Sequence, residues 1–291
     1  MSNLILVTGA TGKIGQEVVK QLTTKGARVR AFFHSPQNAD AIQALGVEIA
    51  LGDLGQPDSL HAALIGVEEL FLLSPMDPRL AAWENNAIRA AQQAGVRHVV
   101  YLSGTNAHVD SSLLFNRLHG QSEAQLKDAG MAYTILRPDT LMQNVLAYAP
   151  TIIAQETFYA PLPDSKTAMV DCRDVAAVAV ASLIERGHEG KVYDITGAEA
   201  LSANQVAQKL SVGLGKNVRC VGLKIDQYRM SLKAAGMPEW LVNYLVGLSE
   251  YGATVKDIVI TTIVAEIAHK PPISFDQFVC DYANVFKGEA G

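Results

Sequence analysis

Short apolar runs alternate with amphipathic segments along the first half of the chain. The runs predict buried strands, and the segments between them, where apolar residues recur three or four positions apart, predict helices. Such alternation indicates a parallel sheet covered on both faces, and right-handed crossovers make the sheet doubly wound. The predicted strands are Leu4–Val7, Val29–Phe33, Val47–Leu51, Leu70–Leu73, Val99–Leu102 and Tyr133–Leu136. The predicted helices are Gly12–Thr24, Asn38–Leu45, Pro57–Leu64, Arg79–Ala94 and Ser111–Ala129.

The pattern changes after Leu136, where residues 138–166 form an irregular stretch with several prolines that we predict to bind a substrate. Asp171 is placed to cap a further helix, and Lys191–Ile195 predicts a strand that rejoins the sheet. The sequence therefore predicts an α/β fold in which a doubly wound parallel sheet is joined to a smaller C-terminal part. The sheet domain takes up residues 1–138 and regains 166–197, and the substrate-binding part takes up 139–165 and 198–291.

The C-terminal part carries further helix signals. Ser202 with Gln205 and Ser274 with Gln277 have the spacing of capping boxes, each of which opens a helix. Helical spacing also predicts Asp226–Ala234 and Glu239–Tyr251. The last helix is predicted to dock through one apolar face, formed by Phe275, Phe278, Val279, Tyr282 and Phe286.

Three glycines, Gly9, Gly12 and Gly15, follow the first strand and lead into its helix. Such a turn lets the backbone approach a ligand closely, and the N–H groups and dipole at the helix start favour a pyrophosphate. The spacing G-x-x-G-x-x-G matches the commonest dinucleotide fingerprint only in part, so a purely structural turn is the alternative. The predicted cofactor-binding residues of this turn are Thr8, Gly9, Thr11, Gly12, Lys13, Ile14 and Gly15.

The loop after the second strand bears on the choice of nicotinamide cofactor. A carboxylate there would bond the ribose hydroxyls of NAD, and a cation would accept the 2′-phosphate of NADP. The loop begins with His34 and Ser35 and holds no acid before Asp40, which counts against NAD. We predict that Lys13, His34 and Ser35 bind the phosphate of NADP (NADPH). The alternative is that Lys13 is a solvated side chain at a helix start, and NAD stays open as a cofactor.

Ligands of a doubly wound sheet bind beyond the carboxyl ends of its strands, which makes three further loops candidates. Asp53 follows the third strand and is predicted to accept an adenine amino group, with an ordinary turn aspartate as the alternative. The loops after the fourth and fifth strands are predicted to flank the nicotinamide end of the cofactor. Their candidate residues are Ser74, Pro75 and Ser103 for the cofactor and Met76 and Thr105 for the substrate.

Composition favours a small-molecule partner. The 291 residues carry a net charge of −5 and no dense basic run, so nucleic acid is not an expected partner. No apolar run approaches the length of a membrane span, and the first residues are not a signal peptide, so we expect a cytoplasmic protein without membrane attachment. Cys172, Cys220 and Cys280 lack ligand spacing, which predicts buried apolar cysteines and no metal site. A homodimer is compatible with the sequence.

Several motifs occur together in an order and spacing typical of one family. They are the glycine turn, Gly52-Asp53, Leu102-Ser103-Gly104, Thr134 to Pro138 followed by Met142 and Asn144, Asp171 to Ala176, and Lys270 to Phe275. With these motifs the chain resembles the NmrA-like group of atypical short-chain dehydrogenases, and within it the branch of NAD(P)H:quinone reductases and triphenylmethane reductases. The resemblance covers nearly the whole chain. It implies an extended Rossmann fold, a bound NADP or NAD, and a substrate cleft between the sheet and the C-terminal part.

One departure from the wider superfamily concerns the predicted helix after the fifth strand. Short-chain dehydrogenases usually place Tyr-x-x-x-Lys there, but this chain has His119 and Glu123 at the same spacing. Residues four apart share a helix face, so both side chains can reach one crevice, where Glu123 would favour the charged form of His119. We predict both as catalytic residues, and an ordinary exposed pair is the alternative.

A reductase is the function that remains when the usual Tyr and Lys are absent. We predict that NADPH passes a hydride to a quinone or a similarly conjugated aromatic acceptor, whose negative charge delocalises and is protonated by water or His119. Met142 is predicted as apolar lining of the substrate site and Asn144 as a polar contact. The rival prediction is a non-catalytic redox sensor that binds NADP, as other NmrA-like proteins do. A sugar-nucleotide epimerase is a third alternative, which the missing Tyr-x-x-x-Lys counts against.

Overall fold

The structure, a computed structural model, describes residues 3–35, 40–255 and 257–289. Its contacts divide the chain into two compact units. The first unit comprises the chain up to Pro138 together with Cys172–Ile195 and Ile263–Lys270. The second unit comprises Asp139–Asp171, Thr196–Thr262 and the chain from Pro271 onward. Each unit is therefore assembled from segments that are separated along the chain.

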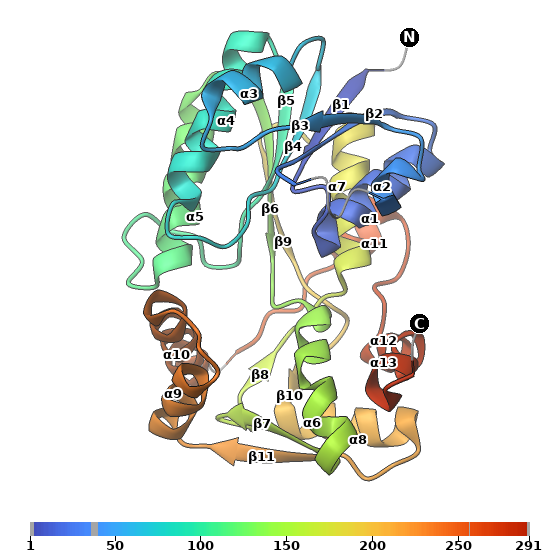
Figure 1. Ribbon diagram of the computed structural model, residues 1–291, viewed down its shortest axis with the longest axis vertical. Helices are drawn as coiled ribbons and strands as arrows, with labels where there is room; N and C mark the ends of the chain where they lie inside the picture. Colours follow the sequence, from blue (N-terminus) through green and yellow to red (C-terminus); the bar gives the residue numbers. More distant parts are fainter. Residues whose placement is uncertain (1–2, 36–39, 256, 290–291) are drawn as a thin grey trace. The chain divides into compact units, whose positions relative to one another are not determined.

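Seven strands form the central sheet of the first unit, in the order β3-β2-β1-β4-β5-β6-β9 (Figure 1). All neighbouring pairs are parallel, and the order reverses on either side of β1. The predicted fold class, an α/β fold with a doubly wound parallel sheet, is confirmed. The strands are β1 (Leu4–Thr8), β2 (Arg28–Phe33), β3 (Glu48–Leu51), β4 (Glu69–Leu72), β5 (His98–Leu102), β6 (Ala132–Pro138) and β9 (Lys191–Ile195).

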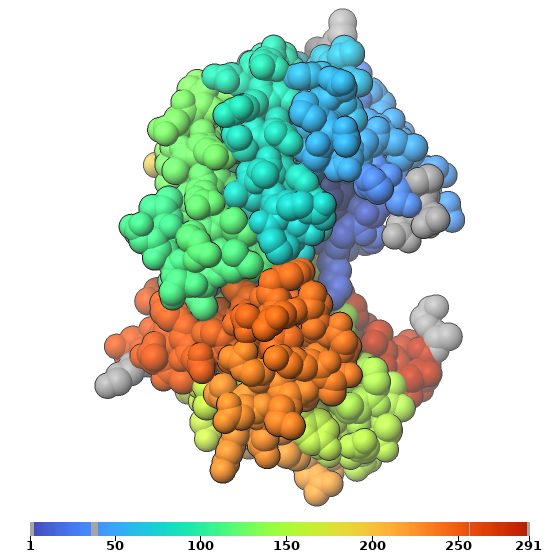
Figure 2. Space-filling view, turned by 60° about the vertical axis from the view of Figure 1, so that its left-hand side comes forward, coloured from blue at the N-terminus to red at the C-terminus, as the bar shows by residue number. Residues whose placement is uncertain are grey.

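Helices cover both faces of this sheet (Figure 1). On one face, α1 (Lys13–Thr24), α7 (Cys172–Ile184) and α11 (Ile263–Ala268) form a layer in which α7 contacts both of the others. The other face is covered by α3 (Pro57–Ala63), α4 (Leu80–Ala94) and α5 (Leu114–Asp128). The segments of α4 and α5 lie side by side on the surface of this unit (Figure 2).

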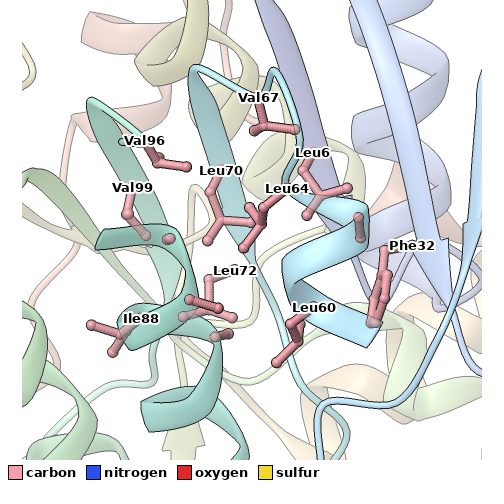
Figure 3. Close-up of a cluster of buried hydrophobic side chains, with 14 of the residues drawn as sticks. Leu6, Phe32, Leu60, Leu64, Val67, Leu70, Leu72, Ile88, Val96 and Val99 are labelled. Carbon is pink, nitrogen blue, oxygen red and sulfur yellow. The ribbon is translucent and has the colours of Figure 1, made fainter. Parts of the chain in front are cut away.

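The core beneath α3, α4 and α5 is built from alternate residues of the strands. Leu70 and Leu72 of β4 meet Leu60 of α3 and Leu64, the residue after α3, there (Figure 3). Because successive side chains of a strand point to opposite faces, every second residue of β5 joins the same layer. Tyr101 is one of them, and its ring is fully buried in this cluster. The phenol of Tyr101 therefore lies in the apolar layer between the sheet and these helices.

The predicted strands and helices of the first unit are all present, with most ends shifted by one or two residues and the start of the α5 helix by three. The predicted helix Asn38–Leu45 begins outside the described residues, and its described part contains the short α2 (Asp40–Gln43). The segment Ile263–Lys270, which we predicted within the C-terminal substrate-binding part, lies in the first unit.

One part of the second unit differs from the prediction along a whole stretch of chain. Residues 138–166, predicted to be irregular, contain the 3-10 helix η2 (Met142–Tyr148), α6 (Ala149–Gln155) and β7 (Thr157–Pro161). Pro150 is compatible with α6 because it lies in the first turn, where its missing N–H has no helical partner to lose. The remaining elements of the unit are β8 (Lys166–Thr167), β10 (Leu201–Ser202), α8 (Ala203–Leu214), β11 (Arg219–Leu223), α9 (Ile225–Ala234), α10 (Glu239–Thr254), α12 (Phe275–Asp281) and α13 (Ala283–Lys287).

The predicted capping boxes and last helix are confirmed in part. Ser202 and Gln205 form a complete capping box at the start of α8. Ser274 accepts from the Gln277 N–H, but the Gln277 side chain donates to Asp281 instead of returning to Ser274. The predicted last helix is split at Tyr282 into α12 and α13, yet its four other apolar residues are all buried as expected.

Two further findings concern the cysteines and the helices. Cys172 is buried as predicted, but Cys220 is only partly buried and Cys280 is exposed, so the prediction of buried cysteines is wrong for the last of them. Within the described residues, no helix combines the length and the apolar character that a membrane crossing needs.

Candidate functional site

The three glycines of the turn between β1 and α1 have two roles. Two of them shape the turn, and the third leaves room for another group beside the backbone. Gly9 has a φ of +59° and lies against Leu73, so a glycine at this position allows the backbone to make the turn. A Cβ on Gly15 would collide with the Gly9 carbonyl, so Gly15 allows the helix to pack on the turn. A Cβ on Gly12 would meet only the Gly9 carbonyl oxygen, at 3.3 Å. Gly12 is therefore the position where another group can approach the backbone.

The start of α1 suits an anion. Gly12 is its N-cap residue and offers no side chain to the first N–H groups, and the first turn holds no acidic residue. Unsatisfied N–H groups and the positive end of the helix dipole favour a phosphate at such a point. Lys13 in the same turn adds a positive charge. The turn thus fits the pyrophosphate of a dinucleotide.

Three other predicted residues of this turn have structural partners. The Thr8 hydroxyl donates to the Leu73 carbonyl at 2.8 Å and accepts from the Leu73 N–H at 2.8 Å, so it ties β1 to the end of β4. The Thr11 carbonyl accepts from the Gln16 side chain. Ile14 is buried under the helix. These residues hold the turn in place, and their contact with a cofactor stays a prediction.

The ends of β2 and β3 bring His34 close to Asp53. His34 is exposed, and its Nε2 lies 3.9 Å from Asp53 Oδ2. Asp53 Oδ1 accepts from the Gly55 N–H at 2.7 Å, and its backbone is held by the Ser59 hydroxyl. Asp53 thus helps to form a turn, as the alternative interpretation expects, and adenine binding stays a prediction. Ser35 follows His34 after the end of β2, the place where a Rossmann fold binds the 2′-phosphate of NADP.

The two predicted serines of the later loops point into the protein. Ser74 after β4 is buried, and its hydroxyl donates to Glu84 Oε1 at 2.7 Å. Ser103 after β5 is also buried, and its hydroxyl donates to Glu123 Oε1 at 2.7 Å. Both side chains position carboxylates, and their contact with a cofactor stays a prediction. Their neighbours Pro75 and Met76 are exposed.

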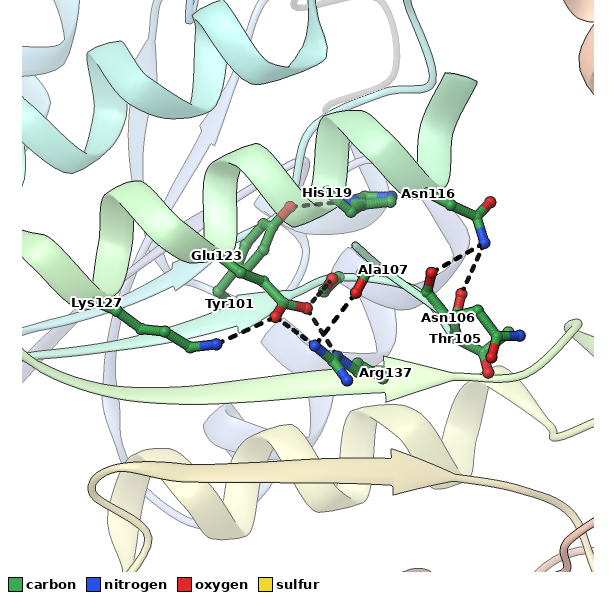
Figure 4. Close-up of polar contacts among 10 residues, drawn as sticks. Tyr101, Thr105, Asn106, Ala107, Asn116, His119, Glu123, Lys127 and Arg137 are labelled. Carbon is green, nitrogen blue, oxygen red and sulfur yellow. Dashed lines mark hydrogen bonds and ion pairs between the residues drawn. The ribbon is translucent and has the colours of Figure 1, made fainter. Parts of the chain in front are cut away.

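The loop after β5 is fixed by α5. Asn116 donates to the carbonyls of Thr105 and Asn106 (Figure 4). Asn106 takes up a positive φ of 57°, which asparagine tolerates better than most residues. Gly120 of α5 permits the approach, because a Cβ there would collide with the backbone of His108. Thr105, a predicted substrate contact, is therefore held rigidly at the carboxyl end of the sheet.

Glu123 is the centre of a buried ion pair (Figure 4). Arg137 of β6 donates to both Glu123 oxygens, from Nε at 2.8 Å and from Nη2 at 2.6 Å. Lys127 Nζ lies 3.5 Å from Glu123 Oε2. Burial alone would favour the neutral acid, but the hydrogen bonds from Arg137 and Ser103 lower the pKa of Glu123. Glu123 is therefore a fixed carboxylate without a proton to give. Glu123 thus serves this site as a fixed negative charge, and its predicted catalytic role stays a prediction.

His119 is connected to a second buried carboxyl through a tyrosine. Its Nδ1 lies 2.7 Å from the Tyr101 hydroxyl (Figure 4), and the same hydroxyl lies 2.7 Å from Glu84 Oε2. Burial raises the pKa of Glu84 to about 7 and that of Tyr101 well above its usual value. Burial lowers the pKa of His119 to about 4, and the Glu123 charge offsets only part of this effect. Glu123 thus raises the pKa of His119, the direction predicted from the sequence, but by less than burial lowers it.

The other edge of the His119 ring faces the loop after β5. A Cβ on Gly104 would lie 3.5 Å from His119 Cδ2 and 3.8 Å from Nε2, so Gly104 adjoins this edge of the ring. His119 is partly exposed, whereas Tyr101 and Glu84 behind it are fully buried. The Nδ1 side of the imidazole thus faces Tyr101 and, behind it, the buried Glu84. The Nε2 side faces the carboxyl end of the sheet.

Sequence reasoning missed Glu84 and Tyr101. Glu84 lies on the buried stripe of α4, at helical spacing from Leu80 and Ile88. A carboxyl inside such a stripe needs a partner, because an unpaired buried charge is costly. This position within the apolar pattern was the available signal for Glu84. The partner itself lies on a strand that packs against α4 only in the folded chain.

The remaining predicted substrate residues lie in the second unit. Met142 opens η2 and is buried in the apolar core of that unit, and its N–H donates to the Val170 carbonyl. Asn144 in the same element is exposed. Among the described residues, no cluster of His, Cys, Asp and Glu has the arrangement of a metal site.

The glycine turn at the head of a doubly wound sheet places the chain in the class of Rossmann-type nucleotide-binding proteins. Within this class the chain belongs to the NmrA-like family, which it matches over residues 1–270, as the resemblance of its motifs implied.

Several similar proteins carry reductase or oxidoreductase names. An NAD(P)H azoreductase from Xenophilus azovorans is 37% identical over 288 residues, which cover 97% of this chain and 99% of the relative. A (4-alkanoyl-5-oxo-2,5-dihydrofuran-3-yl)methyl phosphate reductase from Streptomyces griseus is 36% identical, with 98% and 100% covered. The crystal structure of an NADPH-dependent quinone oxidoreductase from Escherichia coli, complexed with NADPH, is similar with a TM-score of 0.84 at 31% identity, covering 96% of this chain and 99% of that one.

Proposed function

We propose that this protein is an NADPH-dependent reductase that transfers a hydride to a quinone or a similarly conjugated, electron-poor acceptor. The observation that carries the proposal is the imidazole of His119 at the carboxyl end of the sheet, where short-chain dehydrogenases place a phenol beside an ammonium group. A delocalised anion needs less help from an acid than an alkoxide does. The site therefore suits acceptors that spread the negative charge they receive.

The chain's own residues fit the proposed cofactor at two points. Gly12 and the first N–H groups of α1 would face the pyrophosphate, and Lys13, His34 and Ser35 would face the 2′-phosphate. When bound, NADPH supplies the hydride, and the protein supplies alignment and electrostatics. The similar azoreductase and quinone oxidoreductase support this choice, since their names include NAD(P)H and NADPH.

The substrate is proposed to be a small molecule that reaches the loops after β4 and β5. Met76 and Thr105 are the proposed contacts in these loops. Glu123 is proposed to act by holding Arg137 and Ser103 in place. The proposal includes the cytoplasm as the location, and it leaves a homodimer as a state that gel filtration can test.

An assay of NADPH oxidation against a panel of quinones, azo dyes and enones tests the function. We expect oxidation to depend on the added acceptor, and deuterium at the transferred position of the cofactor should slow the chemical step. Tight NADPH binding without reduction of any acceptor would contradict the proposal and favour the redox sensor. Boiled protein and acceptor without protein serve as controls for chemical reduction.

The cofactor preference is tested by calorimetric titration of NADPH and NADH. We expect NADPH to bind more tightly, and Lys13→Ala should weaken NADPH by about 1–3 kcal/mol through loss of a charge-assisted bond, with little effect on NADH. Lys20→Ala, on the exposed side of the same helix, is the matched control. Equal affinities of the wild-type protein for the two cofactors would overturn the phosphate assignment.

A further inference from the structure

The reduction of a quinone by hydride leaves a hydroquinone anion that needs one proton. His119 lies at the carboxyl end of the sheet, where it can give this proton. Its imidazole is neutral near pH 7, however, so it is not an imidazolium that could simply release a proton. The hydrogen bonds behind the ring suggest another source.

We propose that Glu84 is the proton source for the reduced substrate, acting through the Tyr101 hydroxyl and the His119 imidazole. Glu84 and Tyr101 do not touch the substrate in this scheme. They are positioning residues. They supply His119 with a proton, and they replace that proton when His119 gives it to the substrate. The relay rests on the proposed function for its substrate, although its first test needs neither substrate nor cofactor.

The geometry of the three groups forms one unbroken path. Glu84 Oε2 and His119 Nδ1 each lie 2.7 Å from the Tyr101 hydroxyl oxygen, a distance that suits a hydrogen bond in either direction. Tyr101 is 0% exposed and Glu84 is 0% exposed, so water does not compete for these bonds. The second Glu84 oxygen accepts from Ser74, which fixes the carboxyl plane. The path ends at His119 Nε2, beside Gly104.

The proton balance follows from these bonds. Protonated Glu84 donates to the Tyr101 oxygen, Tyr101 donates to His119 Nδ1, and His119 carries its proton on Nε2. When Nε2–H gives its proton to the substrate anion, Nδ1 takes the tyrosine proton and Tyr101 takes the Glu84 proton. One proton has then reached the substrate, Glu84 is a carboxylate, and neither His119 nor Tyr101 has become charged. Solvent reloads the path by the reverse route through Nε2.

The groups around Glu84 support a carboxyl that changes state near neutral pH. Ser74 faces it from the loop after β4, Tyr101 from β5 and Ser122 from α5, and each is an uncharged hydroxyl. Burial raises the pKa of Glu84 to about 7, so both the loaded and the unloaded forms are accessible. Glu123 is the charged group that acts on His119, and its carboxylate is held by Arg137.

The protonation of Glu84 therefore selects the tautomer of His119. Loaded Glu84 gives Nε2–H, and ionised Glu84 accepts from Tyr101, which then accepts from Nδ1–H. Nitrogen NMR of the full-length protein with 15N-labelled histidine, without cofactor or substrate, reads this directly, and His119→Asn assigns the signals. We expect His119 to change from Nε2–H to Nδ1–H between about pH 5.5 and about pH 8.5, the range around neutrality. A single tautomer throughout would overturn the relay.

Variants extend the test to catalysis. Glu84→Gln keeps the hydrogen-bonding shape without a transferable proton, and Tyr101→Phe cuts the path. Each should leave one His119 tautomer at all pH values and lower kcat for quinone reduction by about tenfold or more, with KM little changed. The wild-type kcat should fall as Glu84 ionises above about pH 7, and both variants should lose this fall.

Glu69→Gln is the matched control, because Glu69 is a buried carboxyl bonded to a buried histidine, His98, at the opposite end of the strands. It should keep the wild-type tautomer change and pH profile. If quinones are reduced but Glu84→Gln retains the wild-type pH profile, the relay is wrong and the reductase stands. If no acceptor is reduced, the proposed function is wrong, and the NMR titration alone decides whether the relay exists.

Discussion

Glu84 and Glu123 are buried carboxyls on neighbouring helices, yet their surroundings give them opposite behaviour. Arg137 and Lys127 neutralise Glu123, whereas Glu84 is surrounded by hydroxyl groups. The pKa of Glu123 is lowered and that of Glu84 is raised to about 7. One carboxyl is therefore a permanent charge that organises the loop and strand ends. The other can exchange a proton.

The raised pKa of Glu84 predicts a pH-dependent stability. The neutral acid is favoured in the folded state, so its contribution is fully present below the unfolded pKa of 4.5 and is lost as pH rises to about 7. Glu84→Gln has no carboxyl to ionise at this position, so the variant does not lose this stability as pH rises. Relative to wild type, the variant's free energy of unfolding should rise by about 2–3 kcal/mol between about pH 5 and about pH 8. Urea unfolding at the two pH values measures it.

Glu123→Gln should show the opposite slope in the same experiment. Its folded pKa is lowered, so the carboxylate stabilises the fold above the unfolded pKa and this contribution is lost on acidification. The variant should therefore lose more stability at about pH 8 than near pH 4. Equal slopes for the two variants would contradict the assignment of one neutral and one charged carboxyl.

The candidate site could be predicted only as far as local spacing reaches. The i,i+4 relation of His119 and Glu123 is visible in the sequence, and both side chains do lie near the carboxyl end of the sheet. Their partners Tyr101 and Arg137 come from two different strands. Which strand residue meets which helix residue depends on register and layer packing, and spacing along the chain carries no signal for either.

At the scale of elements, the turn from β1 to α1 makes a prediction about its glycines. Gly12→Val should abolish NADPH binding, because the side chain would stand where a pyrophosphate must approach, while the fold survives with its φ of −78° and one Cβ contact at 3.3 Å. Gly15→Ala should instead damage the fold, since its Cβ would strike the Gly9 carbonyl. Circular dichroism with calorimetric NADPH titration separates the two. Wild-type affinity in folded Gly12→Val would show a purely structural turn.

The elements themselves were largely predictable because burial leaves a clear pattern. Strands such as β4 and β5 are buried on both faces and appear as continuous apolar runs. The prediction for residues 138–166 is wrong because proline usually interrupts helices and strands. Pro150 lies in the first turn of a helix and Pro161 ends a strand, and both positions tolerate proline. The split at Tyr282 has no signal in an apolar pattern that continues through it.

At the scale of the molecule, a late segment returns to the first unit. Lys270, just after α11, pairs at 2.5 Å with Asp174 of α7, which is completely buried. Lys270→Met should cost roughly 1–3 kcal/mol of stability, below the range for fully buried pairs because the Lys270 side chain is 38% exposed. Lys20→Met, which removes an exposed pair with Glu17, should change stability by less than about 1 kcal/mol. Equal effects in chemical unfolding would contradict a special role for Lys270.

The segmented first unit also has a consequence in time, during synthesis of the chain. β6 ends at Pro138 and its outer neighbour β9 begins at Lys191, so the intervening residues, which include the first segment of the second unit, must be made before the sheet can close. At about 5–20 residues per second this takes several seconds. Throughout that interval β6 is an edge strand with unpaired N–H and C=O groups, open to another nascent chain. Translation speed through residues 139–190 thus sets how long the half-built sheet stays open to misassociation.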